Sequence, residues 1–385
     1  MASPIRLASM GMFIIDTFQY FDPATGEDLG NRGLQDQIGG GGCYFAVGAR
    51  VWMPPSEIQM IIDRGVDWRT TDQDVLDRFN RTPSSSSGPS SMWYYRSRPD
   101  RTTRAVNIYR GEHRGFDYLS PKIRLEPSDL LQCSPSIPPK LPEWIHLICS
   151  PGRALETISQ IDAIVAEDGS GFPKLVYEPI PDSCIFENLQ DCLCVLPRLE
   201  VFSPNHEEAA HLLGLYDDWT KVVKQASNDK DAPMDAIVKF ILDNLAGGFA
   251  RHVQEQMAED MEGNEPIGPI ICIRSGAWGS VVGRTGLGFH HISAWHTSTD
   301  RIKDVTGAGN SFLGGFSACL IQTEHDGSLD PVRRVKEAAM HGAVSASLVI
   351  EQLGLPNFDV QSAKETWNDE TASDRLDSLR ARVAP

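Results

Sequence analysis

The hydrophobic positions of this 385-residue chain fall into short apolar runs separated by longer amphipathic segments. Apolar runs predict strands at residues 7 to 15, 144 to 149, 174 to 177, 193 to 196 with Val201, and 270 to 273. Helical periodicity follows at residues 153 to 166, 207 to 213, 311 to 322 and 332 to 351. Strands that alternate with helices predict an α/β fold, with a mostly parallel central sheet covered by helices on both faces.

Several segments interrupt this alternation. Residues 102 to 118 alternate polar and apolar positions around Gly111, which predicts two strands joined by a turn. Residues 21 to 32 are turn-rich and predict an excursion from the sheet. We expect one domain over residues 1 to 360, with a disordered-type loop at 80 to 92, surface elaborations at 217 to 233 and 254 to 266, and a peripheral charged tail at 361 to 385.

Charge excludes one class of partner. The chain has 35 basic and 52 acidic residues, a formal net charge of -17, so most of its surface would repel a polyanion and general nucleic-acid binding is not expected. One arginine-rich stretch is interpreted as a solvated loop or lid edge, with a polyanion site as the alternative: Arg96, Arg98, Arg101 and Arg104.

The eight cysteines lack paired CxxC spacing, and most lie in apolar runs, as expected for reduced thiols of an intracellular protein. Cys192 and Cys194 fit a buried strand better than half of a metal site. Residues 7 to 15 are too short and lack the cleavage site of a signal peptide. No run approaches the ~18 apolar residues of a membrane span. We therefore expect a cytoplasmic, or alternatively nuclear, protein without a membrane partner.

The strongest chemical signal is a glycine-rich loop that leads into an apolar helix, from Asp304 and Thr306 to Asn310. Gly307, Ala308 and Gly309 would leave backbone N–H groups unobstructed at the start of that helix, where phosphate is favoured. A helix that merely begins with convenient glycines is the alternative.

Two further polar clusters follow predicted strands. The strand at 270 to 273 ends in a turn with Ser275, Gly276 and Gly279, and Val201 is followed by Asn205 and Glu208 in an Asn-x-x-Glu spacing. Ligands of open α/β sheets bind at the carboxyl ends of strands, so these clusters predict a shared site.

In this order, the segments resemble the PfkB, or ribokinase-like, family of carbohydrate and nucleoside kinases over residues 11 to about 354. Among its branches the chain looks most like the fungal maintenance-of-killer group. The resemblance implies a three-layer α/β/α sandwich with a small β-sheet lid, formed by about residues 17 to 38 and 102 to 120. It also implies ATP and Mg²⁺ as cofactors, with a monovalent cation as a further candidate.

The resemblance also implies roles for individual residues. The acceptor substrate would contact Asp16, Gly39, Gly40 and Tyr44. The nucleotide would be held by Asn205, Ser275, Gly276, Gly279, Asp304, Thr306, Gly342 and Ser345, with Glu208 organising magnesium. Gly307, Ala308 and Gly309 would form the anion hole beside the catalytic position, Asn310.

Two departures from the family pattern matter. Tyr44 replaces an asparagine and would reshape the sugar pocket. Asn310 replaces the catalytic aspartate, and a neutral amide cannot accept the proton of an attacking hydroxyl, a loss of about 10² to 10⁴ in rate. Asn310 has two other interpretations: a helix cap, or a substitution introduced to trap a complex. His290 and His291 are weak candidates for a replacement base, since adjacent strand residues point to opposite faces.

Two functions remain open at this stage. The first is an ATP-dependent phosphotransferase that acts on a hydroxyl of a sugar- or nucleoside-like molecule, weakened or silenced by Asn310. The second is an inactive pseudokinase that binds nucleotide or metabolite and acts through a protein partner. A homodimer through the open lid edge is a further expectation, because exposed strand edges invite pairing.

Overall fold

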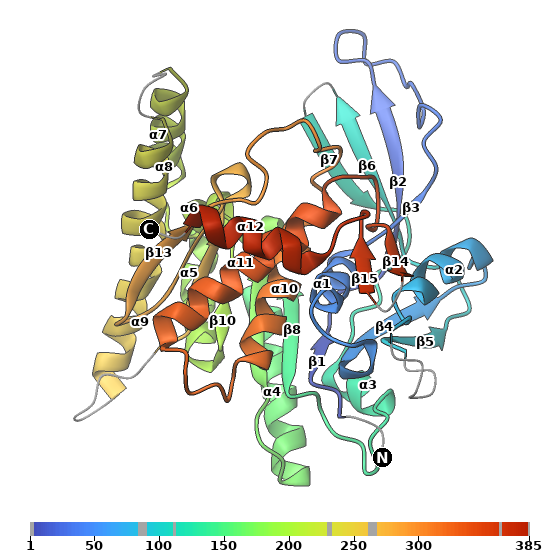
Figure 1. Ribbon diagram of the computed structural model, residues 1–385, viewed down its shortest axis with the longest axis horizontal. Helices are drawn as coiled ribbons and strands as arrows, with labels where there is room; N and C mark the ends of the chain where they lie inside the picture. Colours follow the sequence, from blue (N-terminus) through green and yellow to red (C-terminus); the bar gives the residue numbers. More distant parts are fainter. Residues whose placement is uncertain are drawn as a thin grey trace.

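A computed structural model describes residues 4–83, 91–110, 113–228, 233–260, 268–361 and 364–383. Its centre is a nine-stranded sheet in the order β13-β12-β11-β10-β9-β8-β1-β4-β5 (Figure 1). The strands are β1 (Leu7–Ser9), β4 (Ile58–Arg64), β5 (Trp93–Ser97), β8 (Trp144–Cys149), β9 (Lys174–Pro179), β10 (Val201–Phe202), β11 (Ile270–Arg274), β12 (Ser280–Arg284) and β13 (Gly288–Ile292). Every neighbouring pair from β11 to β5 in this order is parallel, and the β11–β12 and β12–β13 pairs are antiparallel. The sheet is therefore mostly parallel, as the sequence predicts.

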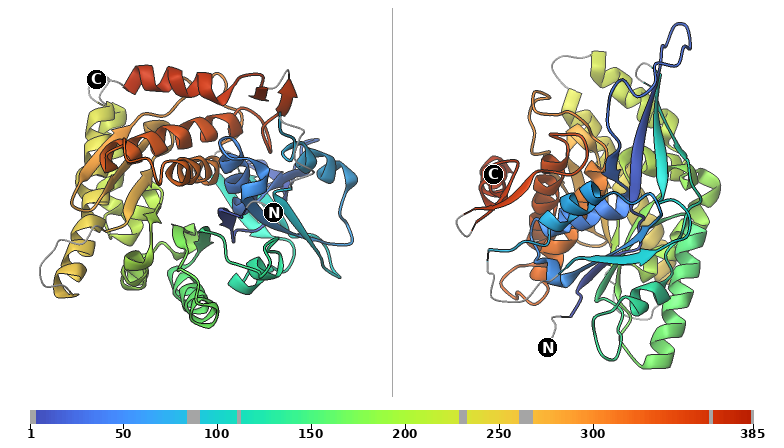
Figure 2. Two further views of the ribbon diagram at one scale, coloured as in Figure 1. Left: turned by 60° about the horizontal axis from the view of Figure 1, so that its bottom comes forward. Right: turned by 90° about the vertical axis from the view of Figure 1, so that its right-hand side faces the viewer.

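Helices cover both faces of the sheet, which gives three layers (Figure 2). They are α1 (Gly41–Arg50), α2 (Thr70–Arg78), α3 (Pro127–Gln132), α4 (Pro151–Asp168), α5 (Leu189–Val195), α6 (His206–Leu212), α7 (Tyr216–Asn228), α8 (Pro233–Phe240), α9 (Gly247–Asp260), α10 (Ala308–Gln322), α11 (Pro331–Val349) and α12 (Ala372–Val383). Neighbouring residues of one strand enter different cores: Leu7 belongs to the cluster that includes residues of α1, α10 and α11, and Ala8 to the cluster that includes residues of α4, α5 and α9. This alternation follows from the two-residue period of a strand.

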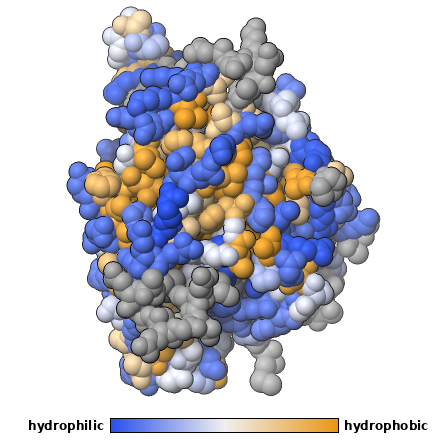
Figure 3. Space-filling view, turned by 90° about the vertical axis from the view of Figure 1, so that its left-hand side faces the viewer, coloured by the Kyte–Doolittle hydropathy of each residue, from blue (hydrophilic) through white to orange (hydrophobic). Residues whose placement is uncertain are grey.

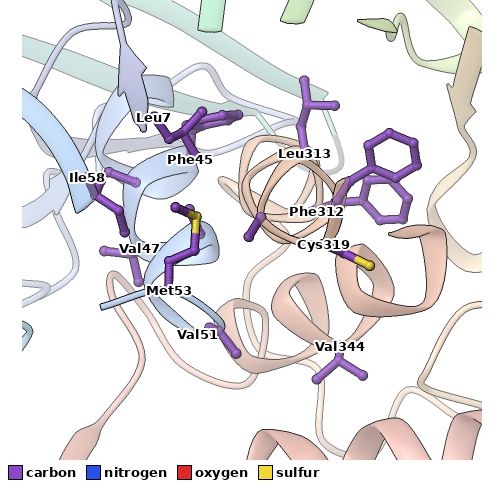
Figure 4. Close-up of a cluster of buried hydrophobic side chains, with 14 of the residues drawn as sticks. Leu7, Phe45, Val47, Val51, Met53, Ile58, Phe312, Leu313, Cys319 and Val344 are labelled. Carbon is purple, nitrogen blue, oxygen red and sulfur yellow. The ribbon is translucent and has the colours of Figure 1, made fainter. Parts of the chain in front are cut away.

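Helices α1 and α10 pack closely because glycines face the opposite backbone. A Cβ on Gly48 would collide with the carbonyl of Ser311, and one on Gly314 with the carbonyl of Phe45. Apolar side chains from both helices, including Phe45 and Leu313, fill the space around this contact (Figure 4). The close packing fixes the start of α10 relative to the start of α1, and both helix starts border the candidate site.

A separate four-stranded sheet projects from the sandwich, in the order β3-β2-β6-β7 (Figure 1). It contains β2 (Ile14–Phe21), β3 (Gln37–Gly39), β6 (Arg104–Arg110) and β7 (His113–Tyr118). The antiparallel β6–β7 pair confirms the strands predicted at residues 102 to 118. The strand predicted at 7 to 15 is wrong as a single element: β1 ends at Ser9 and β2 begins at Ile14. Apolar residues continue through the bend because Phe13 is buried in the core as well.

The strand predicted at residues 193 to 196 is also wrong. Helix α5 covers Leu193, and a short 3-10 turn at Leu196–Arg198 leads to β10. Cys192 is buried on this helix and Cys194 is exposed. A short apolar run does not distinguish a buried strand from a buried helical turn, which explains the error.

The end of the chain belongs to the core. The β14 (Phe358–Gln361) and β15 (Lys364–Trp367) hairpin crosses the predicted boundary at residue 361. Trp367 is 1% exposed and stacks on Phe79, and α12 buries Leu379 completely. The predicted peripheral tail is therefore a packed segment, whose charged residues cover an apolar stripe.

The arginine-rich stretch after the serine loop is paired with carboxylates. Arg96 contacts Asp63 and Asp129, Arg98 contacts Asp100, and Arg101 and Arg104 share Asp67. These pairs leave no free polyanion site in the stretch. The interpretation as a solvated loop or lid edge is wrong for Arg96, which lies on β5 of the central sheet, and for Arg98, which is buried, whereas Arg104 begins the lid strand β6. The preceding predicted loop at 80 to 92 lies largely outside the described residues. None of the helices in the described ranges is long and apolar enough to span a bilayer.

Candidate phosphate and nucleotide site

The first turn of α10 has the geometry of an anion site. Gly307 precedes the helix with φ 78°, a left-handed conformation that favours glycine. A Cβ at Gly307 would collide with the ring of Tyr44, and one at Gly309 with the guanidinium of Arg274. The backbone N–H groups at the start of this 15-residue helix carry partial positive charge. The turn is thus suited to a phosphate and is flanked by an aromatic ring and a cation.

Arg274 ends strand β11 and links the strands to this turn. Its guanidinium donates to the carbonyl of Ser203 at 2.8 Å and pairs with Glu178 at 2.9 Å. The carboxylate of Glu208 lies 3.7 Å away on the other side. Only 12% of the Arg274 side chain is exposed, so these contacts act in a partly dry environment.

Glu178, near the end of β9, is the centre of a buried polar network. One oxygen lies 2.6 Å from Asn310 Nδ2 and 2.8 Å from His146 Nε2, and the other meets Arg274. Burial raises the pKa of Glu178, but the charge of Arg274 and the bonds from His146 and Asn310 outweigh this effect and hold the pKa below its ordinary value. Glu178 is therefore an ionised carboxylate at neutral pH.

The proton positions in this network follow from that charge. An ionised carboxylate only accepts hydrogen bonds, so His146 donates from Nε2 and Asn310 donates from its amide. The other nitrogen of His146 lies 2.9 Å from the hydroxyl of Ser9, and its ring stacks on Phe45 with centroids 3.8 Å apart. Buried neighbours thus fix both the position and the hydrogen-bonding direction of the Asn310 amide.

Asn310 is not the helix cap. Helix α10 begins at Ala308 with Gly307 as its N-cap, so Asn310 is the third helical residue. Its side chain bonds Glu178, and its amide nitrogen lies 3.2 Å from the position a Cβ would take on Gly41. The capping interpretation is wrong, and Asn310 instead connects the anion turn to the start of α1.

The Asn-x-x-Glu motif opens α6 as a capping box. Asn205 accepts from the backbone N–H of Glu208 at 2.8 Å, and Glu208 accepts from the N–H of Asn205 at 2.7 Å. Among the described residues, no group of three acidic, cysteine or histidine side chains could hold a metal ion by itself. Mg²⁺ usually keeps several waters and uses one or two carboxylates beside substrate phosphates, so Glu208 fits such a role.

Glu208 gives the site a pH dependence. Burial raises its pKa from 4.5 to about 7, against the opposing effects of Arg274 and the Asn205 N–H. Between pH 4.5 and 7 the folded protein holds a proton that the unfolded chain has lost, so this residue makes stability fall as pH rises through that window. We expect Glu208→Gln to remove that fall, measured by urea unfolding in a chelator; an unchanged pH profile would contradict the assignment.

The remaining predicted phosphate contacts lie in tight turns. Ser275 donates its backbone N–H to Gly279 at 2.8 Å, and Gly276 and Gly279 have φ of 56° and 81°. Asp304 accepts from both the backbone N–H and the hydroxyl of Thr306. Ser275 directly follows Arg274, and the guanidinium of Arg274 lies against Gly309, so Arg274 links this turn to the anion turn.

A cavity of about 150 Å³ adjoins the Asn310 side of the site. It lies between the lid and the ends of β1 and β8, and its lining includes Gly11, Ile14, Gly41, Tyr118 and Ile148. Nearby, Asp16 packs its carboxylate against Gly39, and Gly40 has φ 94° at the start of α1. Gly41, which directly follows the predicted acceptor residues Gly39 and Gly40, lines this cavity and lies close to Asn310.

Ribokinase structures share this arrangement of sheet, helices and lid. Ribokinase from Giardia lamblia superposes with a TM-score of 0.61 at 15% identity, over 99% of this chain and 100% of that chain. Ribokinase of Arabidopsis thaliana, complexed with ribose and ATP, gives 0.55 at 16% identity, over 98% and 99%. The fold is that of ribokinase. This confirms the three-layer architecture predicted from the sequence.

Two curated relatives cover almost the whole ribokinase-like chain, each at 28% identity. An uncharacterized protein of Schizosaccharomyces pombe matches 97% of this chain and 92% of its own length. Protein MAK32 of Saccharomyces cerevisiae matches 95% and 89%. The latter is consistent with the predicted maintenance-of-killer resemblance. No family model matches the chain.

Most of the predicted site residues meet at one edge of the ribokinase-like sheet, but two do not extend that cluster. A Cβ on Gly342 would collide with the carbonyl of Phe312, and Ser345 donates to the carbonyl of Gly48. These contacts give both residues a helix-packing role, and their role beside adenine stays a prediction. His291 donates to the carbonyl of Trp278, and His290 lies on the same edge strand, so neither is drawn into the Glu178 network.

Sequence reasoning missed Glu178, His146 and Arg274. All three are polar residues in otherwise apolar strands, at positions where a mostly buried parallel sheet favours aliphatic side chains. Their positions offered a signal: Arg274 directly follows the predicted strand at 270 to 273, whose end the sequence placed at the site, and Glu178 directly follows the predicted strand at 174 to 177.

Proposed function

We propose that this protein binds ATP through the anion turn at Gly307 to Gly309 and is a PfkB-type phosphotransferase of weak activity. The acceptor is a hydroxyl of a sugar- or nucleoside-like molecule. The observation that carries the proposal is the left-handed Gly307 at the start of α10, with Arg274 against Gly309. Ribokinases solved with ATP or ADP share the fold and support the choice of nucleotide.

Each chemical element has a candidate in this chain. Backbone N–H groups of the anion turn would stabilise charge on the transferred phosphoryl group. Glu208 would hold magnesium through water, and magnesium would neutralise phosphate charge when bound. The acceptor would enter the cavity beside Gly41 and Asn310, under Tyr118 of the lid. Asn310 would position the hydroxyl but could not remove its proton.

A second candidate is a nucleotide- or metabolite-binding pseudokinase that acts through another protein. The bond between Asn310 and Glu178 favours it, since it commits the amide at the catalytic position to an internal partner. The face beside α7 and α8 displays apolar side chains among polar ones (Figure 3). Part of the predicted surface elaboration, residues 229 to 232, lies outside the described residues.

Calorimetry with ATP and magnesium, beside a phosphotransfer screen over sugars and nucleosides, tests both candidates. We expect ATP binding and slow transfer to one acceptor, about 10² to 10⁴ below a kinase with an intact base. Gly307→Val is the matched negative control, because its side chain would meet Tyr44 at a positive φ. Binding without any transfer selects the pseudokinase, and a failure to bind ATP overturns the nucleotide site itself.

A further inference from the structure

Arg274 has binding capacity that its internal contacts do not use. A guanidinium carries five N–H donors. Nη2 donates a hydrogen bond to the carbonyl of Ser203, and Nη1 makes an ion pair with Glu178. Glu208, at 3.7 Å, is too distant for a hydrogen bond. Within the described part of the chain, Arg274 Nε is buried and has no hydrogen-bond partner. A buried donor without a partner is costly and is a reason to expect a ligand there.

The position of Arg274 points to the kind of ligand. Its Nη1 lies 2.2 Å from the position that a Cβ of Gly309 would take, so the missing side chain makes room for the guanidinium at the first turn of α10. A guanidinium and the N–H groups of a helix start therefore lie next to each other at this turn. Their shared preference is for a phosphate group, which a guanidinium binds in fork geometry.

We propose that Arg274 is a built-in phosphate ligand of the anion turn, held against Gly309 by Glu178, and that it supplies part of the charge neutralisation otherwise provided by magnesium. This deepens the proposed function and rests on it. The ligand is the polyphosphate of a nucleotide. Glu178 is a positioning residue, since it is almost completely buried behind Asn310 and reaches the ligand only through Arg274.

The charge of the cluster supports this role. Arg274 pairs with one carboxylate, Glu178, at 2.9 Å, and the carboxylate of Glu208 lies farther away, at 3.7 Å. Asn310 adds no charge. An aspartate there would place a second anion 2.6 Å from Glu178 and beside the phosphate position. The neutral amide thus leaves Arg274 with charge to offer an anionic ligand.

The test compares ATP and inorganic tripolyphosphate binding by calorimetry, with magnesium and again in EDTA. We expect the unmodified protein to keep its affinity within about tenfold in EDTA. Arg274→Gln should lose about 10- to 100-fold in both buffers, the usual value of a hydrogen bond to a charged group. The double variant E178Q/R274Q removes both charges, so no buried carboxylate is left unpaired to destabilise the fold. It should show the same loss of affinity as Arg274→Gln, which separates an effect on binding from a folding defect.

Arg284→Gln is the matched control. Arg284 ends the neighbouring strand β12, is similarly buried at 18% side-chain exposure, and pairs with Glu200 away from the anion turn. The affinity of the Arg284→Gln variant for ATP and for tripolyphosphate should stay unchanged. Equal affinity of the unmodified protein and E178Q/R274Q overturns the role of Arg274 while the nucleotide site stands. A lack of binding by the unmodified protein overturns the proposed function, and the role of Arg274 with it.

Discussion

Asn310→Asp alone should destabilise the protein and fail to speed phosphoryl transfer. The new carboxylate would stand where the amide nitrogen now donates to Glu178 at 2.6 Å. Two carboxylates this close cannot both be ionised, so one must take up a proton or move. We expect a loss of about 3 kcal/mol in the free energy of unfolding at neutral pH, as for other disrupted buried charge pairs.

Adding Glu178→Gln should reverse the outcome. The network can then run in the opposite direction: a glutamine amide would donate to the introduced carboxylate at position 310 and to His146, and its oxygen would accept from Arg274. The introduced carboxylate would then be available to accept a proton from the acceptor hydroxyl. Phosphoryl transfer by N310D/E178Q should rise about 10² to 10⁴ above that of the unmodified protein.

Transfer rates and urea unfolding of the unmodified protein, both single variants and the double variant give a complete cycle. A large coupling between residues 310 and 178, with activity gained only in the double variant, is the expected result. A single Asn310→Asp change that raises transfer about a hundredfold, the scale of a restored base, would show that Glu178 does not govern the catalytic position. Glu178→Gln alone controls for the loss of the buried charge.

Trp367→Ala should cost about 3 to 5 kcal/mol of unfolding free energy, the usual range for a buried aromatic side chain. Its ring stacks on Phe79 and lies 4.6 Å from the ring of Phe358. Arg50 also lies over both hairpin aromatics, so the cavity would open beside a buried cation.

Urea unfolding followed by circular dichroism measures this cost. Val66→Ala, at a side chain 77% exposed, is the control and should change stability by no more than about 0.5 kcal/mol. If the two variants were equally stable, the hairpin would not be part of the cooperative core.

The sequence predicted elements whose pattern is long and periodic. Helices α10 and α11 and the β6–β7 pair lie where residues 311 to 322, 332 to 351 and 102 to 118 indicated. It failed at Leu193, where four apolar residues fit a strand and a helical turn equally well. The sequence did not indicate the burial of Trp367 and Leu379, because these residues are spaced among charged ones.

The candidate site could be predicted where the backbone geometry requires particular residue types. The glycines at positions 307 and 309 and the Asn205 to Glu208 spacing are examples. The pairing of Asn310 with Glu178 joins residues 132 positions apart, and no local pattern encodes it. The meaning of the asparagine therefore changes once its partner is known: its amide is held by a buried carboxylate on β9.

The buried Arg50 carries a consequence for synthesis of the protein. Its two carboxylate bonds go to Glu365, 315 positions later in the chain. During translation the helix that carries Arg50 emerges early, together with the backbone carbonyls of Phe79 and Arg81 that the side chain also contacts, but its carboxylate partner is made among the last residues. The ribosome must therefore release nearly the whole chain before this core can close, so premature termination near residue 360 would produce a polypeptide that chaperones and proteases treat as unfinished.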